Sequence, residues 1–600
     1  MYVCALRPRG EPLTRGDVFG YMARLKRGRE DALHSIVEGP FAAIALAPAQ
    51  QQRPRLGRWR GLIGVGDVRL DNRAEIAALA RVDAAELTDI EIVLAAVDAT
   101  GEASIARLLG DFAFVVWDAR AQKLMAVRDA FGVKPLFHRA DSDLVLFASE
   151  VAPLQRDEAY DNSYIATYLS GQTAPQERTI WHDISSVRAG SIVRQRGTVQ
   201  AQERYWRAEE FVPEPDGDVA ANCFRFRELL EEAVRVRVER PGETWAQLSG
   251  GLDSSSVVAF ANLLRSPAQR VAGTITVVDS LGDGDERVYS DAVVQRYQLA
   301  NEQVRDYWAW QADGEPPPVT DQPSGVYPFF ARDRRLWNIV RNAGGRVLLS
   351  GLGADHYLYG SLDYITDLAA TGHVGAAVRE ATTWAVATRQ SFWKVGRRYL
   401  VDPFVHSGPA RARSPRWLTP TAAAQLIPPA RQRPRRGLRF AYRIAEDLQS
   451  LPAWFQRWPF GDEVEMRYPF LYRPLVEWSL RLPATQRVRP HARKWILREA
   501  TRDVLPESVR TRATKGGIDA RILWSLQRER TRIDALLRDP MLAQLGCIDP
   551  AVLRTAVEQA RCGIPVNNVL LFSALALETW LAVRNGQWPV LEEAAAATAA

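Results

Sequence analysis

Short apolar runs dominate the first third of the chain. They have strand length and are separated by glycine, aspartate and arginine, which predicts stacked β-sheets. Two segments between them, 71–80 and 88–101, have helical spacing, and Thr88 is the expected N-cap of the second. The clearest strand-like runs are "FAAIALAP" (41–48), "GLIGVGDVRL" (61–70), "DFAFVVWDA" (111–119), "LMAVRDA" (124–130) and "DLVLFASE" (143–150).

The pattern changes after an acidic segment rich in proline and glycine at 206–220. A long amphipathic helix (220–240) leads to an apolar run, a glycine-rich loop, a second helix (254–265) and the run "VAGTITVVD" (271–279). This order of strand, loop, helix and strand is typical of a parallel α/β sheet. A third run, "GRVLLSG" (345–351), ends in another glycine-rich loop, and mostly helices are expected beyond it.

These changes of pattern predict the domain organisation. At 600 residues the chain is longer than one ordinary domain, and its 47% hydrophobic content is enough for large cores. We expect an N-terminal domain at 1–205, a linker at 206–220 and a C-terminal domain at 221–590. The low-complexity end at 591–600 is expected to be a disordered tail.

Composition narrows the cellular setting. The chain has no apolar stretch long enough for a membrane span or a signal peptide, so no membrane partner is expected. Its cysteines lack metal or disulfide spacing, which favours a reduced, cytoplasmic location. Nearly all basic residues are arginine, so a run such as 431–439 is interpreted as a solvated loop, and no nucleic-acid partner is expected. The cysteines are Cys4, Cys223, Cys547 and Cys562.

The sequence "LSGGLDSSS" (248–256) carries the first candidate chemistry. Its glycines let backbone N–H groups face a ligand, and the following helix N-terminus attracts anions. The loop lacks the Gly-Lys-Ser/Thr ending of a Walker loop, which argues against a standard γ-phosphate transfer site. Asp253 would repel phosphate unless a divalent cation joins them. The residues expected to bind the nucleotide are Leu248, Ser249, Gly250, Gly251, Ser254 and Ser255.

"SGGLDSS" resembles the pyrophosphate-binding motif of enzymes that cleave ATP between its α- and β-phosphates and adenylate a substrate. Residues 108–137, "LLGDFAFVVWDARAQKLMAVRDAFGVKPLF", resemble the glutamine-amidotransferase half of class B asparagine synthetases. "VLLSGLGADHYLYG" (347–360) and "TRATKGG" (511–517) resemble their synthetase half. The resemblance extends over nearly the whole chain. It implies an α/β protein with an Ntn-type α/β/β/α sandwich, followed by a parallel-sheet ATP pyrophosphatase domain with helical additions.

The resemblance also implies an ATP site with Mg²⁺. Asp253 and Asp355 match the family's metal-binding aspartates, and both follow glycine-rich turns at predicted strand ends, where parallel sheets bind ligands. Gly351 and Gly353 are expected to help bind ATP.

Lys515 in "RATKGG" matches the family's catalytic lysine, which would neutralise the α-phosphate and stabilise an oxyanion. The chain has only six lysines, so a lysine beside a motif is more informative than usual. For Lys494, a supporting role at the site and an ordinary place at a helix start are both open.

The N-terminus departs from the family pattern. Glutamine-using members begin Met-Cys, and that cysteine is the nucleophile while its own α-amine is the base. This chain has Tyr2 instead, and Cys4 is expected to be an ordinary strand residue. Asn72 and Asp89 match glutamine-binding positions, but without the nucleophile they would release no ammonia. We therefore expect a retained scaffold domain without glutaminase activity.

A second departure lies at 350–355. The family motif of asparagine synthetases at this position is similar to Ser-Gly-Glu-Gly-x-Asp, whereas this chain reads "SGLGAD". Leu352 takes the place of a glutamate that is linked to ammonia handling, and leucine accepts no proton. His356 follows Asp355 and is a candidate general base, with an orienting or structural role as the alternative.

Both departures favour ATP activation without glutamine-derived ammonia, so the attacking amine would belong to the substrate. The chain thus resembles lasso peptide cyclases more than β-lactam synthetases. This implies adenylation of an Asp or Glu side chain in a leader-free linear core peptide. Attack by the peptide's own α-amine would then form an isopeptide (macrolactam) bond and release AMP, after pyrophosphate. The expected partners are the core peptide, a leader peptidase and a leader-recognition protein.

Other functions remain open at this point. One is a small-molecule amide ligase, either β-lactam synthetase-like or an ammonia-using asparagine synthetase. Another is a catalytically silent scaffold that binds ATP or peptide. A tRNA-thiolating enzyme is disfavoured because no suitably placed cysteine pair is present. The aromatic segments 308–311, 324–333 and 392–400 are candidates for a peptide groove, with ordinary core packing as the alternative.

Overall fold

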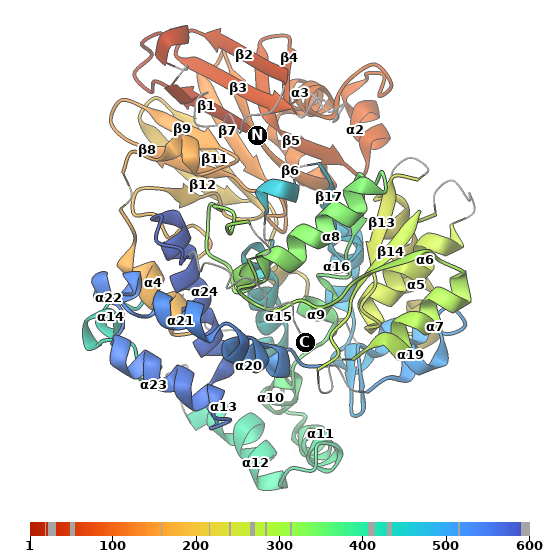
Figure 1. The fold of residues 1–600 in the computed structure, drawn as a ribbon. Coiled ribbons are helices and arrows are strands. Elements are labelled where there is room, and N and C mark those ends of the chain that lie inside the picture. Colours follow the sequence, from red (N-terminus) through yellow and green to blue (C-terminus); the bar gives the residue numbers. More distant parts are fainter. Residues whose placement is uncertain are drawn as a thin grey trace.

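A computed structural model gives the fold in two parts, an N-terminal pair of β-sheets and a C-terminal parallel sheet surrounded by helices (Figure 1). The tail 591–600 and part of the arginine-rich run, 431–434, lie outside the described residues. The structure describes residues 1–17, 20–21, 32–47, 55–157, 159–214, 217–238, 242–264, 270–281, 285–312, 315–405, 414–428, 435–455, 457–461, 463–513 and 516–589.

The N-terminal part is the predicted sandwich. Two six-stranded antiparallel sheets, ordered β10-β8-β9-β1-β3-β2 and β12-β11-β7-β6-β5-β4, pack face to face. Phe41 and Trp117 stack between them with ring centroids 5.7 Å apart. The strands are β1 (Tyr2–Leu6), β2 (Ala32–Glu38), β3 (Phe41–Ala47), β4 (Leu56–Trp59), β5 (Leu62–Leu70), β6 (Gly110–Asp118), β7 (Lys123–Arg128), β8 (Phe137–Ala140), β9 (Val145–Ala148), β10 (Ser185–Ser186), β11 (Ser191–Arg196) and β12 (Val199–Arg204).

Helices cover the outer face of the second sheet. They are α2 (Arg73–Ala80) and α3 (Asp89–Thr100), whereas α4 (Asn162–Leu169) contacts α14 (Pro420–Ala424) and α24 (Asn568–Arg584) of the C-terminal part. Thr88 caps α3 through a reciprocal capping box with Glu91, as its sequence predicts. The predicted strands and helices of this half are therefore confirmed.

The C-terminal part is built on a parallel sheet of order β15-β14-β13-β16-β17. Helices α5 (Val219–Arg235), α6 (Leu252–Leu263) and α7 (Arg287–Tyr297) cover one face. Helix α8 (Phe330–Asn342) covers the other, and α24 (Asn568–Arg584) packs with α20–α23 (519–561) at one side of the sheet. The strands are β13 (Thr244–Gln247), β14 (Gly273–Val277), β15 (Asn301–Val304), β16 (Val347–Leu349) and β17 (Glu465–Arg467).

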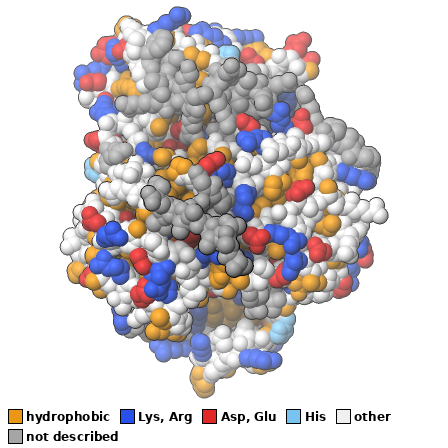
Figure 2. Space-filling model, in the orientation of Figure 1, with side chains coloured by type: hydrophobic (Ala, Val, Ile, Leu, Met, Phe, Trp, Pro, Cys, Tyr) orange, Lys and Arg blue, Asp and Glu red, His pale blue; other side chains and the backbone are white. Residues whose placement is uncertain are grey.

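The remaining chain forms the expected helical additions, which extend below the sheet in Figure 1. Among the described residues, no helix combines the length and the apolar character needed to cross a membrane. Basic and acidic side chains are interleaved over the face shown in Figure 2. The additions are α9 (Ala354–Leu358), α10 (Asp363–Ala370), α11 (Val374–Ala387), α12 (Phe392–Gly396), α13 (Asp402–Val405), α14 (Pro420–Ala424), α15 (Arg439–Gln449), α16 (Arg473–Arg481), α17 (Ala484–Arg487), α18 (Trp495–Ala500), α19 (Glu507–Thr511), α20 (Asp519–Arg528), α21 (Arg530–Leu536), α22 (Met541–Gln544) and α23 (Pro550–Arg561).

A buried ion network joins the two parts. Arg69 pairs with Asp71 and Asp111 at 2.5 and 2.7 Å. Arg237, just after α5, approaches Asp71 at 3.1 Å. These four side chains are only 1–4% exposed, so each charge depends on its partners for the stabilisation that water would otherwise give.

Removal of one member of this network should destabilise the fold. In Arg237→Ala the buried carboxylates lose a cation, and we expect the free energy of unfolding to fall by about 3–5 kcal/mol. Arg235→Ala is the matched control, because Arg235 makes only an exposed pair with Glu232 at 2.6 Å and should cost less than about 1 kcal/mol. Denaturant unfolding of both variants measures the difference, and equal losses would contradict this role.

Candidate active site

The glycine-rich loop after β13 leads directly into α6. Gly250 has φ +77°, and a Cβ atom there would come within 2.8 Å of the Glu286 carbonyl oxygen and 2.9 Å of the Ser290 nitrogen. Glycine is therefore required both by the backbone angle and by the close approach of α7. Gly251 is the N-cap of α6, and no side chain caps the helix. This uncapped N-terminus is the predicted place for an anion.

The side chains of this loop divide into exposed and internal groups. Ser249 is exposed, and its hydroxyl lies 2.9 Å from that of Ser254, which also accepts from the Ser249 amide at 3.1 Å. Ser255 is fully buried in α6. Leu248 is also buried, and its amide and carbonyl bond to β14 at 2.9 and 2.8 Å. The predicted ligand contacts of Leu248 and of the Ser255 hydroxyl are thus corrected: both residues support the loop from inside.

The loop after β16 touches the first loop directly. A Cβ atom on Gly351 would lie 2.6 Å from the Ser254 nitrogen and 2.9 Å from the Asp253 carbonyl carbon. Gly353 has φ +112° and lies against Leu471. The carboxyl ends of β13 and β16 are neighbours in the sheet, so the two motifs, about 100 residues apart in sequence, meet at one edge.

Lys494 joins the aspartates of the two loops. Its ammonium lies 2.5 Å from Asp253 Oδ2 and 2.6 Å from Asp355 Oδ1, while the residue itself is 7% exposed. Burial acts to lower the pKa of Lys494, but the two carboxylates outweigh it and hold the pKa above its usual value. The sequence left its role open, and the scarcity of lysines was the one signal that pointed to it.

The donor set fits the Mg²⁺ that the ATP-site resemblance implies. Asp253 and Asp355 converge on one positive charge, so their carboxylates are already arranged around a cation. No cluster of three or more His, Cys, Asp or Glu side chains with metal-binding geometry occurs in the described part of the chain. Mg²⁺ is commonly held by one or two carboxylates together with substrate phosphates and water. These two aspartates would hold the ion together with ATP.

Lys515 lies outside the described residues, but both flanks of its loop are anchored beside the first loop. Arg512 donates to Glu286 Oε1 at 2.5 Å, and the Gly516 amide donates to the same oxygen at 2.9 Å. Glu286 is also the residue whose carbonyl abuts Gly250. The ends of the lysine-bearing loop are therefore fixed next to the predicted phosphate site.

His356 lies beside Asp355 at the start of α9. Burial is the main cause that lowers its pKa, and the neighbouring Asp355 carboxylate opposes the change. Its Nδ1 is buried without a hydrogen-bond partner among the described residues, and the ring meets Trp454 edge-on with centroids 6.1 Å apart. The imidazole is thus placed to be neutral at neutral pH, while Leu352 packs against the core as an apolar side chain.

The comparisons with known proteins agree with both halves of this architecture. The asparagine synthase family matches residues 225–582, more than half of the chain. The chain belongs to the asparagine synthase family. The glutamine amidotransferase domain family matches residues 73–206. Membership supports an ATP-dependent amide ligase.

Relatives in the family are distant. Asparagine synthetase [glutamine-hydrolyzing] 1 of Bacillus subtilis is 22% identical and aligns with 72% of this chain and 71% of its own length. Amidase chyE of Penicillium rubens is 24% identical, with 79% of each chain covered. The solved glutamine PRPP amidotransferase of B. subtilis, complexed with ADP and GMP, has a TM-score of 0.25 and 13% identity over 58% of this chain and 81% of its own.

In the glutaminase-like half, the residues near the position of the family's nucleophilic cysteine are buried. Tyr2 is fully buried, and its hydroxyl donates to the Ala113 carbonyl at 2.9 Å. Cys4 lies inside β1 with 2% exposure, as expected for a strand residue, and burial raises the pKa of its thiol far above the usual value. A thiol that stays protonated and buried is a poor nucleophile.

The residues at the glutamine-binding positions are used internally. The Asn72 amide donates to Glu75 and to the Arg107 carbonyl at 2.9 and 3.0 Å and accepts from the Leu109 amide at 3.0 Å. Asp89 accepts from the Leu70 amide at 3.1 Å and also from Arg73. Their polar atoms hold the α2–α3 region together.

The contact between the two loops can be tested with Gly351→Ala. The added methyl group would push against the backbone of Asp253 and Ser254 and shift the two aspartates relative to each other. We expect ATP-dependent AMP formation to fall by about 100-fold, because misplacement of a reacting group by about 1 Å has that effect. Gly375→Ala is the control, since nothing lies within 4 Å of its added methyl group. An active Gly351→Ala enzyme would contradict the close fit.

The role of the Lys494 ammonium can be tested by measuring the stability of variants at this position. Lys494→Met leaves two carboxylates facing each other, and we expect the free energy of unfolding to fall by about 1–3 kcal/mol, less than for a fully buried pair because Asp355 is partly exposed. Millimolar Mg²⁺ should restore part of this loss in the variant and change the wild type less. Asp355→Asn combined with Lys494→Met should abolish the Mg²⁺ response. Thermal unfolding with and without MgCl₂ measures all three.

Proposed function

We propose that the protein is an ATP-dependent macrolactam synthetase of the lasso peptide cyclase type. It adenylates an Asp or Glu side chain within a linear, leader-free core peptide, and the α-amine of the same peptide forms the isopeptide bond. The observation that carries this proposal is the contrast between the two halves. The ATP-binding loops and their aspartates are intact, whereas the only cysteine near the N-terminus is buried and protonated.

The proposed reaction has two steps. A substrate carboxylate oxygen attacks the α-phosphorus of ATP, the bond to the β-phosphate oxygen breaks, and pyrophosphate leaves. The uncharged peptide amine then attacks the acyl carbon, AMP leaves with the former carboxylate oxygen, and the amine gives up a proton. The uncapped N-terminus of α6 would bind the pyrophosphate, and Lys515 would stabilise the charge on the adenylate and the oxyanion. Mg²⁺, held by Asp253 and Asp355, would neutralise phosphate charge.

Leu352 supports an amine supplied by the substrate. It packs among apolar side chains where the family motif places a glutamate linked to ammonia handling. A leucine side chain neither binds an ammonium ion nor accepts its proton. His356, beside Asp355, is the candidate base, and its lowered pKa keeps the imidazole unprotonated and able to accept a proton. The peptide, a leader peptidase and a leader-recognition protein are the proposed partners.

Mass spectrometry tests the proposal directly. Purified protein is incubated with ATP, Mg²⁺ and a linear, leader-free core peptide, chosen from any short precursor gene found beside its own. The expected result is loss of one water from the peptide, with one AMP and one pyrophosphate released for each ring. Formation of asparagine from aspartate and ammonia, without dehydration of the peptide, would establish a small-molecule amide ligase instead.

Two substitutions test the roles within the site. Asp253→Ala should abolish pyrophosphate release, because the substrate phosphates lose their metal ligand. Lys515→Ala should lower peptide cyclisation by at least about 100-fold, as expected for loss of an oxyanion-stabilising group. Lys394→Ala is the control for a lysine far from the site, on exposed α12. Wild-type rates for either site variant would refute its assignment.

A further inference from the structure

A large cavity lies between the two parts of the protein. Its volume is about 1390 Å³, above the roughly 300–1,000 Å³ of small-molecule pockets. The N-terminal sandwich supplies one wall, and the loops around β17, the start of α8 and helices α20 and α24 supply the others. The residues that line it include neither the first glycine-rich loop nor Asp355. It is therefore a space separate from the predicted ATP site.

Trp454 connects the lining of this cavity to the residue beside Asp355. Trp454 lines the cavity, and its ring meets His356, the neighbour of Asp355. Ile518, close behind the Lys515 loop, lines the cavity as well. A chain held in the cavity thus has only a short way to reach the two aspartates. A small-molecule amine that accepts the acyl group would need no cavity of this volume.

The wall from the N-terminal domain is polar and carries more cations than carboxylates: Arg55, Arg128, Lys134 and Arg178 line it together with Asp67. Lys134 bridges Asp67 and Glu465 at 3.4 and 2.9 Å, and Arg55 pairs with Asp67 at 3.5 Å. These pairs offset part of the positive charge of the wall, whereas Arg128 donates to backbone carbonyls, so the lining offers both charged and neutral polar groups to a ligand. Aromatic side chains such as Trp458 and Phe329 alternate with these polar groups around the lining. This mixture suits a chain with both apolar side chains and amide groups.

A buried donor points to the same ligand class. Gln322 lines the cavity, and its Oε1 accepts from the Ile180 amide at 3.3 Å. Its Nε2 is buried without a hydrogen-bond partner among the described residues. An unsatisfied buried donor is costly, and a carbonyl group of a bound ligand would relieve it. Peptide carbonyls are the recurring acceptors of an oligopeptide.

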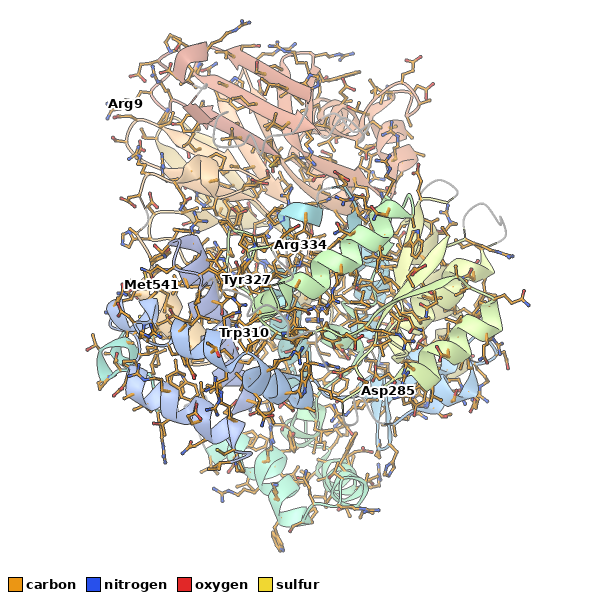
Figure 3. All side chains as sticks on the ribbon, viewed as in Figure 1. Arg9, Asp285, Trp310, Tyr327, Arg334 and Met541 are labelled. Atoms are coloured by element: carbon orange, nitrogen blue, oxygen red, sulfur yellow. The ribbon has the colours of Figure 1, made fainter. Side chains whose placement is uncertain are left out.

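The aromatic segments expected to form a groove divide between cavity, core and surface. In 308–311, Trp310 is fully buried, donates to Thr579 Oγ1 at 2.8 Å, and lies with Tyr327 inside the C-terminal domain (Figure 3). In 392–400, Trp393 is 81% exposed on α12, away from the cavity lining. Trp310 thus follows the alternative of ordinary core packing, and Trp393 lies on the surface. From 324–333, Ser324, Val326 and Phe329 do line the cavity.

We propose that this cavity binds the peptide chain of the acceptor, and that the N-terminal domain acts as one wall of the binding chamber. The glutaminase-like domain would then be retained for substrate binding rather than for ammonia release. This inference rests on the proposed function, because it assigns the place where the peptide lies during cyclisation. It adds a site for an oligopeptide that is distinct from the ATP-binding loops.

Filling the cavity from the N-terminal side tests the proposal. Ala174 lines the cavity, and Ala174→Trp should occupy space that the peptide needs. Ala453→Trp does the same from the C-terminal side. Ala201→Trp, on the exposed strand β12 outside the lining, is the matched control. The probe is a pool of linear peptides with a free α-amine, one internal Asp or Glu and random residues elsewhere, and retention on immobilised protein is measured by mass spectrometry.

We expect both cavity variants to lose retention of the peptides that wild type and Ala201→Trp retain, by at least about tenfold. Binding of ATP and the unfolding temperature should stay unchanged, which separates a filled cavity from a damaged fold. Gln322→Leu should weaken retention by about five- to tenfold, because the amide donor is lost. A benzophenone-bearing peptide should cross-link to lining residues of both domains.

The outcomes are distinguishable from failure of the proposed function. Undiminished retention by Ala174→Trp, or cross-links confined to residues outside the lining, would overturn the chamber while leaving a cyclisation result untouched. The chamber would also be overturned if the wild-type protein binds ATP but retains no peptide. Conversely, peptide retention in the cavity without dehydration of the core peptide would preserve the binding site and contradict the cyclase.

Discussion

The ammonium of Lys494 holds together the two loops on which the active site depends. Two carboxylates at the carboxyl edge of the sheet would repel each other, and this buried cation at 2.5 and 2.6 Å makes their approach favourable. Its left-handed backbone, φ 55°, places it at the start of α18, a helix far along the chain from both loops. Three distant segments are thereby fixed around one point of positive charge. A bound nucleotide with its metal ion would bring further positive and negative charge to that point.

Direct backbone contacts also hold the loops of this region close together. Gly351 touches the backbone of Asp253 and Ser254, and Gly250 touches α7 near Glu286, which in turn anchors Arg512 and Gly516. Each contact excludes even a methyl group, so the loops pack without freedom to separate. The glycine-rich loop after β13, the aspartate pair and the flanks of the lysine-bearing loop are consequently packed in one connected arrangement. Such preorganisation lowers the cost of arranging charges during reaction.

Much of the fold was predictable because its elements have strong local patterns. The strand runs of the sandwich, the capped helix at Thr88 and the strand–loop–helix order around "LSGGLDSSS" all form as expected. Residue type and position predicted Asp253 and Asp355 as a pair, and the structure brings them together at Lys494, but the sequence did not show which hydroxyls face outward. Ser255 and Leu248 belong to the same string as Ser249, yet helix and sheet geometry turn them into the core. The aromatic segments left core packing and a groove both open, because tryptophan suits a core and a groove equally well, and the structure divides them between the two and the surface.

The sequence by itself determined the family, the two-part architecture, the two glycine-rich loops at predicted strand ends and the absence of a cysteine at position 2, because these depend on local pattern and residue identity. Only the tertiary structure decided that Lys494 bridges the aspartates, that Cys4 is buried, and that a cavity opens between the domains. These features arise from residues hundreds of positions apart. Long-range packing places such residues together, and no local periodicity or motif spacing records that placement.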